Sequence, residues 1–464
     1  MRNHAAFLER LDPRRRRRGA VVATLAFAAS VGVGAGAGTP LQGSGSWLTY
    51  GGTPTRESVQ TAGPPLRPLR MAWRSATLRG PIYGEPLVWS GRIYVATEAD
   101  VVYGLDARTG VVAWRRTLGV PVPAGALPCG DIAPSVGVTS TMVLDAARAE
   151  LFVSAALTVH GRVRHELFAL DPGNGRVRWR RDLDLPGADP AALLQRAALA
   201  LDRGRVLVGF GGNYGDCAAY RGTVVAVGES GRGPLHSYVV PTVHGGAIWA
   251  PAGLAVDGAG HVFAATGNGA STGRYDGGDS VFELSATLAL LGTFAPANWR
   301  ALNAGDLDLG SNAPMLLPGS RALIVGKNAI ANLLSTVSPA ALARPLASVP
   351  ACFSIGGDAY LAPLAYVACP DGALTALRVG PGSLRVVWRG PPGTSGSPTV
   401  AGGLVWVLGG GELRGLAPAT GRQLVTVPVI STTRYVAPSA AEGLLVVGGT
   451  TCVEAFAGPR GWQP

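Results

Sequence analysis

Four carboxylates fall within one short region in the middle of the chain. Asp276 and Asp279 belong to the segment Asp-Gly-Gly-Asp, and Asp306 and Asp308 follow in the segment Asp-Leu-Asp. Carboxylate oxygens are preferred ligands of hard cations, so the group could hold a metal ion. Aspartate also caps turns by accepting backbone N–H bonds, and this is the interpretation we favour here.

The chain has a single lysine, Lys327, among 40 basic residues. A histidine, His244, precedes two glycines at a position expected to face the centre of the fold. A lone histidine with no Ser or Asp partner in a recognisable order is weak evidence for catalysis. These residue types alone define no reaction, so the elements that position them must be identified first.

One sequence unit recurs along the chain, and it decides the fold. It consists of a short apolar run that ends in Asp, a tight turn closed by Gly, and a second run that carries Trp. Two copies are clear: Asp106, Gly110 and Trp114 in the first, and Asp171, Gly175 and Trp179 in the second. Asp accepts backbone N–H bonds in such a turn, and Gly takes the position with φ > 0 that closes it.

Six weaker copies end near residues 228, 285, 335, 378, 421 and 456, and an apolar hairpin precedes each copy. The pattern predicts an all-β fold, an eight-bladed β-propeller of four-stranded antiparallel blades whose closed ring leaves few strand edges open. The last unit lacks an outer strand, which we expect segment 47–52 at the N-terminal side to supply. Residues 188–200 are expected to hold one helical turn within a blade insertion.

The turn Leu-Asp-x-x-Thr-Gly-x-x-x-Trp, which ends at Trp114 in its clearest copy, resembles the tryptophan-docking motif of the pyrroloquinoline quinone (PQQ)-like propeller repeats. The resemblance covers nearly all of the chain after Trp47. It implies that the Trp of one blade docks against the neighbouring blade. The family includes quinoprotein alcohol dehydrogenases and the propeller lipoprotein of the outer-membrane assembly machinery, so the motif indicates a fold and leaves the function open.

Several segments resemble the site in which the dehydrogenases hold PQQ over Ca²⁺. The resemblance implies a floor under the quinone at Trp249, calcium ligands at Asn268 and Asp306, a catalytic base at Asp308, and quinone contacts at Lys327 and Asn328. A flat indole suits a flat cofactor, oxygen atoms suit a hard cation, and a carboxylate can accept the hydroxyl proton. A cation beside the quinone oxygens would polarise them for hydride transfer.

Three departures from the dehydrogenases count against this chemistry. The dehydrogenases carry two adjacent cysteines over the quinone, whereas this chain has only Cys129 at the corresponding place. Cys217 lies where a calcium-ligand glutamate is expected, and sulfur does not suit Ca²⁺. The chain also has no Cys-x-x-Cys-His haem motif. From the resemblance we infer a disulfide between Cys129 and Cys217 near the pore mouth, occupying space that the cofactor would need.

The other cysteines are expected to be structural. Cys352 and Cys369 flank a hairpin-like segment in the sixth blade, and an exported protein favours a second disulfide there. Cys452 is predicted to be a buried free thiol. The alternative is that all five cysteines are reduced and buried. No cysteine spacing resembles a zinc site.

The first 37 residues have the pattern of a secretory signal peptide. Residues 1–18 contain seven arginines and two acids, an apolar stretch follows, and an Ala-x-Ala sequence ends at Ala37. An uncleaved membrane anchor is the alternative. Residues 38–46 are then a linker and 47–464 the propeller. We expect export to the cell envelope or the extracellular space, with membrane contact only through the N-terminal segment.

Composition excludes several classes of protein. Gly (67 residues) and Pro (35) are the worst residues for helix interiors, which argues against a helical bundle. With 47% hydrophobic and 15% charged residues, the chain is not a disordered one. The net charge of +11 owes +5 to residues 1–18, so the propeller keeps an ordinary surface charge with no footprint for a nucleic acid.

Three functions fit these observations. The preferred one is an exported, non-catalytic PQQ-like propeller, monomeric and without an obligate cofactor, that binds a small ligand or an envelope protein partner through its pore face. The second is a quinoprotein alcohol dehydrogenase that uses PQQ and Ca²⁺. The third is an envelope-assembly scaffold, which is disfavoured because no cysteine for lipid attachment lies near the predicted cleavage position.

Overall fold

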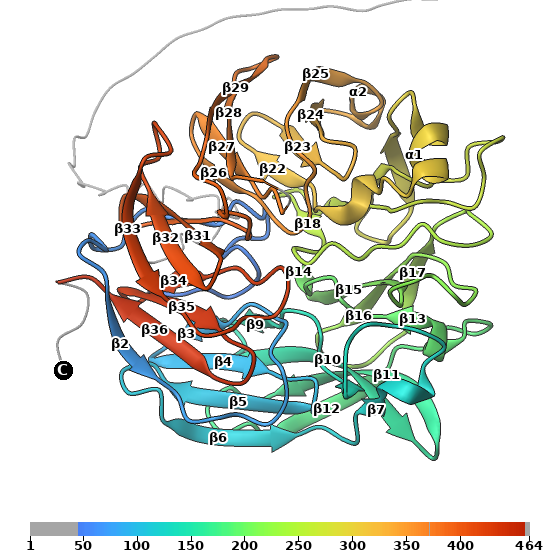
Figure 1. Cartoon of the computed structure of the whole chain (residues 1–464). Coiled ribbons are helices and arrows are strands. Elements are labelled where there is room, and N and C mark those ends of the chain that lie inside the picture. Colours follow the sequence, from blue (N-terminus) through green and yellow to red (C-terminus); the bar gives the residue numbers. More distant parts are fainter. Residues whose placement is uncertain (1–44, 371, 460–464) are drawn as a thin grey trace, which may run out of the picture. The chain divides into compact units, whose positions relative to one another are not determined.

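The computed structural model describes residues 45–370 and 372–459. The predicted signal or anchor segment 1–37 and residues 38–44 of the linker lie outside this part of the chain. The described residues form eight antiparallel blades arranged as a ring (Figure 1), which confirms the predicted propeller. No helix in this part is long and apolar enough to cross a membrane.

The first four blades each follow the chain from the centre of the ring outward. Their strands are, for blade 1, β3 (Leu87–Trp89), β4 (Arg92–Ala96), β5 (Val101–Asp106) and β6 (Val112–Thr117); for blade 2, β9 (Val143–Asp145), β10 (Glu150–Val159), β11 (Arg162–Leu170) and β12 (Val177–Asp182); for blade 3, β14 (Ala200–Asp202), β15 (Arg205–Gly212), β16 (Thr223–Gly228) and β17 (His236–Val239); for blade 4, β18 (Ala255–Val256), β19 (Val262–Ala265), β20 (Val281–Leu284) and β21 (Leu290–Phe294).

The last four blades repeat this order, except that the outer strand of blade 8 comes from the N-terminal side. The strands are, for blade 5, β22 (Met315–Leu317), β23 (Arg321–Val325), β24 (Ile330–Ser335) and β25 (Pro345–Pro350); for blade 6, β26 (Ala359–Leu361), β27 (Leu364–Val367), β28 (Thr375–Val379) and β29 (Leu384–Arg389); for blade 7, β30 (Thr399–Ala401), β31 (Leu404–Gly409), β32 (Glu412–Leu416) and β33 (Gln423–Pro428); for blade 8, β34 (Ser439–Ala441), β35 (Leu444–Gly448), β36 (Val453–Ala457) and β2 (Arg70–Arg74).

Short elements outside the four-stranded pattern decorate the blades. They are β1 (Val59–Gln60), β7 (Val122–Pro123), β8 (Ser135–Val136), β13 (Leu193–Leu194), the helices α1 (Trp299–Gly305) and α2 (Pro339–Leu342), and the 3-10 turns η1 (Ala124–Ala126), η2 (Pro190–Ala192) and η3 (Leu309–Ser311). The turn η2 lies inside the stretch where a helical turn was expected.

Burial along the strands explains why the sequence forms blades. Second and third strands such as β10 and β16 are apolar and buried along most of their length, because neighbouring blades cover both of their faces. Outer strands such as β6 and β12 alternate between half-buried and exposed residues, as expected for the edge of a half-covered sheet. The apolar residues between the blades form the core.

The ring is closed by β2, which pairs antiparallel with β36 of the last blade. In Figure 1 the blue β2 lies beside the red β36. The prediction that an N-terminal strand closes the ring is therefore confirmed, but its assignment to segment 47–52 is wrong. Trp47 is fully buried and pairs instead with Val88 of β3, the innermost strand of blade 1, because its large apolar side chain is accommodated at the ring centre.

The segment 47–60 follows the inner edges of the blades in order from blade 1 to blade 7. Its carbonyls accept hydrogen bonds from the innermost strands, for example from Leu144 to Leu48 and from Tyr360 to Glu57. It ends in β1, which pairs parallel with β30. The segment therefore covers strand edges that would otherwise be left unpaired at the ring centre.

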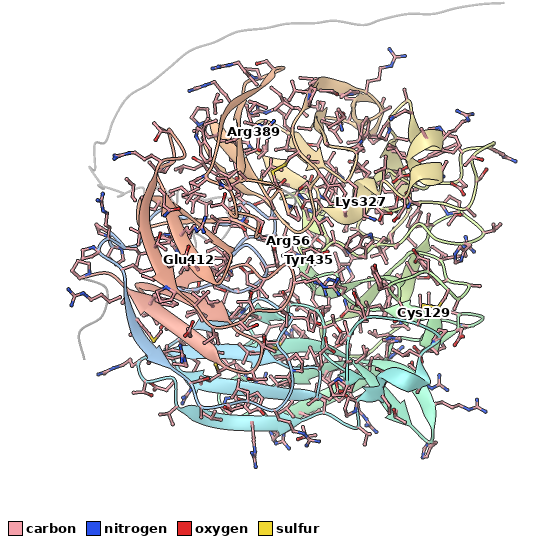
Figure 2. The ribbon with its side chains drawn as sticks, viewed as in Figure 1. Arg56, Cys129, Lys327, Arg389, Glu412 and Tyr435 are labelled. Atoms are coloured by element: carbon pink, nitrogen blue, oxygen red, sulfur yellow. A yellow bond between two sulfur atoms is a disulfide. The ribbon has the colours of Figure 1, made fainter. Side chains whose placement is uncertain are left out.

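Arg56 fixes this segment from within. Its guanidinium is 2% exposed and donates to Leu254 O (2.8 Å), Leu199 O (3.1 Å), Tyr50 O (3.0 Å) and Thr49 Oγ1 (2.6 Å). Figure 2 labels it near the middle of the ring. A buried cation of this kind is tolerated because its donors are satisfied by oxygens of several blades.

Tryptophans of the repeat dock across the seams between blades. The indole N–H of Trp114 in blade 1 donates to Pro172 O (2.9 Å) in the turn of blade 2. A Cβ atom added to Gly175 of that turn would lie 2.4 Å from the Trp114 ring. The same arrangement joins the following pairs: Trp73 with Ala107 and Gly110, Trp179 with Glu229 and Gly231, and Trp388 with Pro418 and Gly421.

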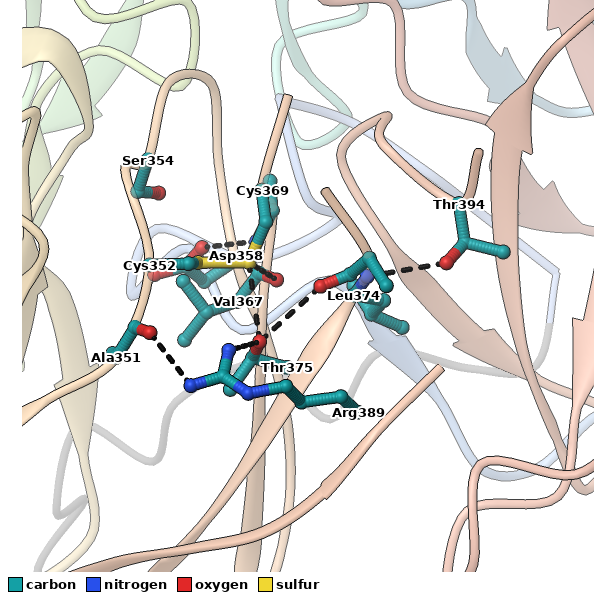
Figure 3. The surroundings of a disulfide bond; sticks show 12 residues. Ala351, Cys352, Ser354, Asp358, Val367, Cys369, Leu374, Thr375, Arg389 and Thr394 are labelled. Atoms are coloured by element: carbon teal, nitrogen blue, oxygen red, sulfur yellow. Dashed lines mark hydrogen bonds between the residues drawn. A yellow bond between two sulfur atoms is a disulfide. The ribbon is translucent and has the colours of Figure 1, made fainter. Parts of the chain in front are cut away.

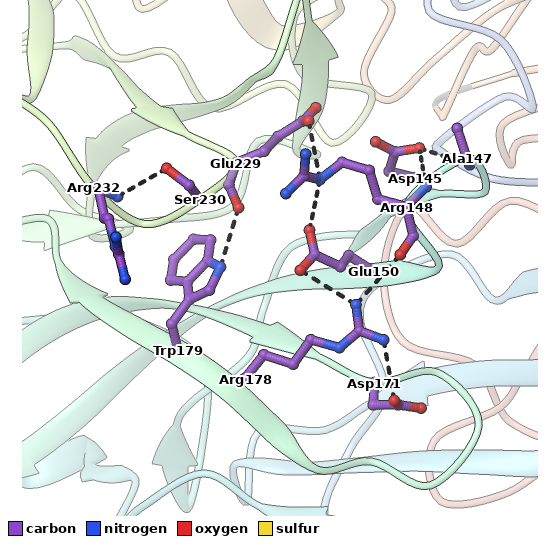
Figure 4. A network of polar contacts seen from close by, with 10 residues as sticks. All are labelled: Asp145, Ala147, Arg148, Glu150, Asp171, Arg178, Trp179, Glu229, Ser230 and Arg232. Carbon is purple, nitrogen blue, oxygen red and sulfur yellow. Dashed lines mark hydrogen bonds and ion pairs between the residues drawn. The ribbon is translucent and has the colours of Figure 1, made fainter.

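Charged residues reinforce the seam between blades 2 and 3 (Figure 4). Arg148 pairs with Glu150 (2.9 Å) and lies 3.6 Å from Glu229, whose backbone carbonyl accepts the Trp179 indole N–H. Arg178 joins Glu150 to Asp171 of the turn. The Asp of the repeat therefore caps its own turn and also takes part in an ion-pair network.

Both expected disulfides are present, Cys129–Cys217 and Cys352–Cys369. The alternative of five reduced cysteines is therefore wrong. Figure 3 shows the second bridge beside Arg389, which donates to Thr375 Oγ1 and to a backbone carbonyl. Cys452 is free, as expected, but it is half-buried rather than buried, because it lies in the turn that precedes β36.

Candidate functional site

A cavity of about 510 Å³ lies where the loops of several blades converge. Blade 1 contributes Tyr83, blade 3 contributes Tyr220, blade 4 contributes Trp249, blade 5 contributes Lys327, and the loop before blade 8 contributes Tyr435. Loops from blades so far apart in sequence meet only near the axis of the ring. Figure 2 labels Tyr435 close to that axis and Lys327 nearby. The volume is in the range of small-molecule sites.

Lys327 is held in an ion-pair cluster at one side of this cavity. Its ammonium lies 2.7 Å from Asp308 Oδ2 and 3.2 Å from Asp306 Oδ1, and its side chain is 15% exposed. The backbone N–H of Lys327 donates to Asp308 O, and a Cβ atom on Gly326 would lie 2.6 Å from that oxygen. The glycine before the lysine is therefore needed for the close approach of the two chain segments.

The protonation of the cluster follows from burial and charge. Burial alone would lower the pKa of Lys327, but the carboxylates of Asp308 and Asp306 outweigh it and raise the pKa. Burial raises the pKa of Asp308, and the nearby ammonium opposes this shift. The side chain of Asp306 is 77% exposed. In this cluster the charged Lys327 lies between the buried carboxylate of Asp308 and the exposed carboxylate of Asp306.

Asn268 completes the cluster. Its backbone N–H donates to Asp308 Oδ1 (2.8 Å), and its side-chain amide donates to Asp306 Oδ1 (2.8 Å). Its Oδ1 is buried and accepts no hydrogen bond from the described residues. The Trp249 ring lies near the cluster, with the Lys327 ammonium 5.7 Å from the ring centroid.

Five of the six residues assigned by resemblance to the cofactor site therefore lie together. They are Trp249, Asn268, Asp306, Asp308 and Lys327. Asn328 does not join them, although it is the next residue after Lys327. It lines a separate cavity with Phe294 and Arg344, and its side chain caps the N–H of Ile330. Adjacent residues in an extended turn point in different directions, which separates the pair.

Of the remaining carboxylates of the region, Asp276 caps its own turn, whereas Asp279 joins two loops that are distant in sequence. Asp276 accepts from Ser271 N and Thr242 Oγ1, and Asp279 accepts from Leu309 N. Within the described ranges no three residues of the types His, Cys, Asp and Glu are grouped closely enough to hold a metal ion. A shared cation site formed by the four carboxylates is therefore not found there.

His244 has a packing role. Its ring lies 5.2 Å from that of Tyr220, edge to face, and its Nδ1 faces the Tyr220 backbone N–H at 3.5 Å. It does not line the cavity. The weak indication of catalysis at this residue thus finds no support in its surroundings.

The residues around the cluster do not fit Ca²⁺. The orphaned Oδ1 of Asn268 is a suitable donor, but the Lys327 ammonium already lies between the carboxylates of Asp306 and Asp308. Cys217, at the expected place of a further ligand, is bonded to Cys129. A second cation beside the ammonium would be repelled by it, so these residues do not form a calcium site of the family type in the described part of the chain.

The Cys129–Cys217 bridge lies close to the cavity without lining it. The disulfide was expected to occupy space that the cofactor would need, and the bridge itself is present. Neither Cys129 nor Cys217 lines the cavity. The bridge lies behind the wall, where a Cβ atom on Gly215 would be 3.8 Å from Cys129 Sγ.

Sequence reasoning missed the half of the cavity opposite Lys327. Arg196 lies there between the rings of Tyr83 and Tyr435, at 5.4 and 5.2 Å from their centroids. Beside it, Arg434 forms an ion pair with Asp131. These residues lie in irregular loops outside the repeat unit, and the sequence offers no motif that would have singled them out.

Comparisons with known proteins agree with the fold. A family model described as outer membrane protein assembly factor BamB matches residues 70–280. None of the curated protein sequences matches the chain significantly. Among solved structures, the quinohemoprotein alcohol dehydrogenase ADHIIG from Pseudomonas putida HK5 is 16% identical with a TM-score of 0.70, covering 90% of this chain and 81% of that one.

Two further structures are similar. The quinohemoprotein alcohol dehydrogenase from Comamonas testosteroni is 18% identical with a TM-score of 0.68, covering 90% of this chain and 82% of that one. BamB from Moraxella catarrhalis is 13% identical with a TM-score of 0.59, covering 84% and 99%. The chain has the eight-bladed propeller fold of both kinds of protein, and residues 70–280 match the PQQ-like family model. Identities this low establish the fold and no activity.

Proposed function

We propose that this chain is an exported PQQ-like propeller that binds a small organic ligand in its central cavity and catalyses no reaction on it. The ion pair between Lys327 and Asp308 carries the proposal. Both carboxylate oxygens of Asp308 already accept hydrogen bonds, one from the ammonium and one from Asn268 N. Each oxygen keeps a further lone pair, but the Lys327 ammonium stabilises the charged carboxylate and so weakens Asp308 as a general base.

The cavity itself supports ligand binding. Its volume of about 510 Å³ can hold a small organic molecule. Its wall carries several aromatic rings: Tyr83, Tyr214, Tyr220, Trp249 and Tyr435. Flat aromatic side chains give a ligand large contact areas at low entropic cost. A small ligand therefore suits this face better than a protein partner, which remains the second candidate from the family match with BamB.

The quinoprotein dehydrogenase is the alternative in the enzyme class. It is favoured by Trp249, Asn268, Asp308 and Lys327 lining one cavity, and by the unpartnered Oδ1 of Asn268. If PQQ bound there, it would supply hydride acceptance. Trp249 and Lys327 would then hold the ring system, while Asp308 would remain the candidate base. Because the residues present do not fit Ca²⁺, the dehydrogenase is the second proposal.

Purified full-length protein incubated with PQQ, with and without Ca²⁺, separates the two proposals. After desalting, the bound quinone absorbance is measured, together with reduction of an artificial dye in the presence of simple alcohols. We expect no Ca²⁺-dependent turnover. Stoichiometric PQQ binding with turnover that Lys327→Ala abolishes, and that Asn328→Ala outside the cavity leaves intact, would establish the dehydrogenase instead.

Export is part of the proposal and has its own test. Two disulfides suit an oxidising compartment, and a cleavable segment would end at Ala37. We expect cell fractionation to recover the protein outside the cytoplasm, with a mature N-terminus at Gly38. Recovery in the cytoplasm with free thiols at Cys129 and Cys217 would contradict export.

A further inference from the structure

One charge in the cavity has no counter-charge. Arg196 is 9% exposed, and its Nε is buried with no hydrogen-bond partner in the described part of the chain. Its one hydrogen bond to the protein there goes from Nη2 to the backbone oxygen of Arg434 at 3.2 Å. No carboxylate of residues 45–370 and 372–459 lies within ion-pair distance. Burial lowers the pKa of this guanidinium, as expected for an uncompensated cation.

The other cations of the cavity are paired, which sets Arg196 apart. Lys327 lies between two carboxylates, and Arg434 pairs with Asp131. The acid whose charge acts on Arg196 most directly is Glu98, but its Oε2 accepts hydrogen bonds from Gly137 and from Thr139 rather than from the guanidinium. The protein therefore does not neutralise this arginine by direct contact.

An unpaired buried cation is unfavourable unless something offsets its desolvation. The rings of Tyr83 and Tyr435 on either side of Arg196 offset part of this desolvation free energy through cation–π attraction. They also hold the plane of the guanidinium in place. A guanidinium carries five N–H donors in a fork that matches a carboxylate, and most of those of Arg196 remain unused.

We infer that Arg196 anchors a carboxylate of the cavity ligand, and that this ligand is a small organic acid with an aromatic or otherwise conjugated body. The inference rests on the proposed binding function and specifies its ligand. The carboxylate takes the fork of Arg196 between Tyr83 and Tyr435, and the body lies against the aromatic wall that includes Trp249. A neutral molecule of the same shape leaves the buried cation unpaired and binds more weakly.

The test compares benzoate with benzamide, which have similar shape and differ in charge. Thermal unfolding of the full chain is followed in the presence of each compound at about 10 mM. A compound that binds only the folded state raises Tm. We expect benzoate to raise Tm and benzamide to leave it nearly unchanged, and Arg196→Gln to remove the effect of benzoate.

Arg414→Gln is the matched control, because Arg414 pairs with Glu412 and does not line the cavity. We expect it to keep most of the benzoate shift. Equal shifts for acid and amide, including no shift for either, overturn the inference, as does a benzoate shift that survives in Arg196→Gln. Equal binding of both compounds would leave the proposed binding function standing, whereas PQQ-dependent turnover would remove that function without touching the role of Arg196.

If Arg196→Gln fails to fold, Arg196→Lys provides a second measurement. Lysine keeps the positive charge and loses the planar fork. We expect its benzoate affinity, measured by titration of tryptophan fluorescence, to fall at least about tenfold relative to the native protein, as a lost bidentate contact predicts. An unchanged affinity would show that the fork does not bind the acid.

Discussion

Two buried arginines near the ring axis show how a structural residue differs from a binding residue. Arg56 is more deeply buried than Arg196, and burial lowers its pKa to about 10. Oxygens from several blades nevertheless accept its hydrogen bonds, so the charge is used to hold the N-terminal segment. Arg196 has no such set of acceptors and faces a cavity. Satisfied donors indicate a structural role, and unsatisfied donors beside open volume indicate a ligand.

The charges in the cluster around Lys327 are also satisfied within the protein. In this chain the ammonium neutralises the carboxylates of Asp306 and Asp308 from within the protein. Lys327, which was expected to contact a cofactor, is therefore held in the cavity wall by ion pairs within the protein. Asn268 Oδ1 is buried in this cluster and accepts no hydrogen bond from the described residues.

At the scale of elements, the blades are joined by repeated tryptophan seams. Each docked indole covers a glycine of the next blade that has φ near +70°, as at Gly110 and Gly175. Two requirements therefore coincide at one residue: a left-handed backbone, and space for a neighbouring ring. This coincidence explains why glycine stands at this position in each of the four docked turns.

Substituting Gly175 by Ala should weaken the seam between blades 1 and 2. The new Cβ atom would lie 2.4 Å from the Trp114 ring, at a backbone φ of +70°. We expect the free energy of unfolding to fall by about 2 to 4 kcal/mol, combining left-handed strain with overpacking. Urea unfolding followed by tryptophan fluorescence measures this loss.

Gly161→Ala is the control for that prediction. Gly161 has φ +73°, but an added Cβ atom would meet no atom within 4 Å. Its substitution therefore carries the backbone strain alone, about 1 kcal/mol. Equal losses in the two variants would show that docking on Trp114 adds nothing to stability.

The sequence predicts the features that repeat and misses those that occur once. Asp, Gly and Trp at fixed spacing, as in Asp171 and Trp179, indicate a local turn, and two clear and six weaker copies of this unit predict the ring. The position of Trp47 depends on contacts with innermost strands far away in sequence, so the outer strand was assigned to the wrong segment. Arg196 was missed for the same reason, because its partners Tyr83 and Tyr435 come together only in the folded ring.

At the scale of the whole molecule, the packing of the blades buries an unusual set of acids. Burial raises the pKa of Glu98 and Asp358 to about 7 and that of Glu85 and Asp279 to about 8. The cause is desolvation, which disfavours the charged form where the ring excludes water. The folded protein therefore keeps protons on these groups that the unfolded chain has already released.

The sign of the pH dependence follows from this difference in bound protons. Between about pH 4.5 and pH 8 the folded state binds more protons than the unfolded state, so the free energy of unfolding falls as the pH rises. The stabilisation is complete below the ordinary pKa of a carboxylic acid and is lost as the pH passes the raised values. We expect urea unfolding to show lower stability at pH 8 than at pH 5.

Glu98→Gln isolates one contributor. Glutamine keeps an oxygen to accept from Gly137 N and Thr139 Oγ1, and it removes the titrating proton. Because one unit of pKa difference corresponds to about 1.4 kcal/mol, the pH-dependent loss should shrink by up to about 3 kcal/mol in this variant. Glu412→Gln on the surface serves as control and should leave the slope as in the native protein. A native slope that is flat or rising over this range, or one that Glu98→Gln does not alter, would mean that Glu98 is ionised in the folded ring and that a counter-charge reaches it there.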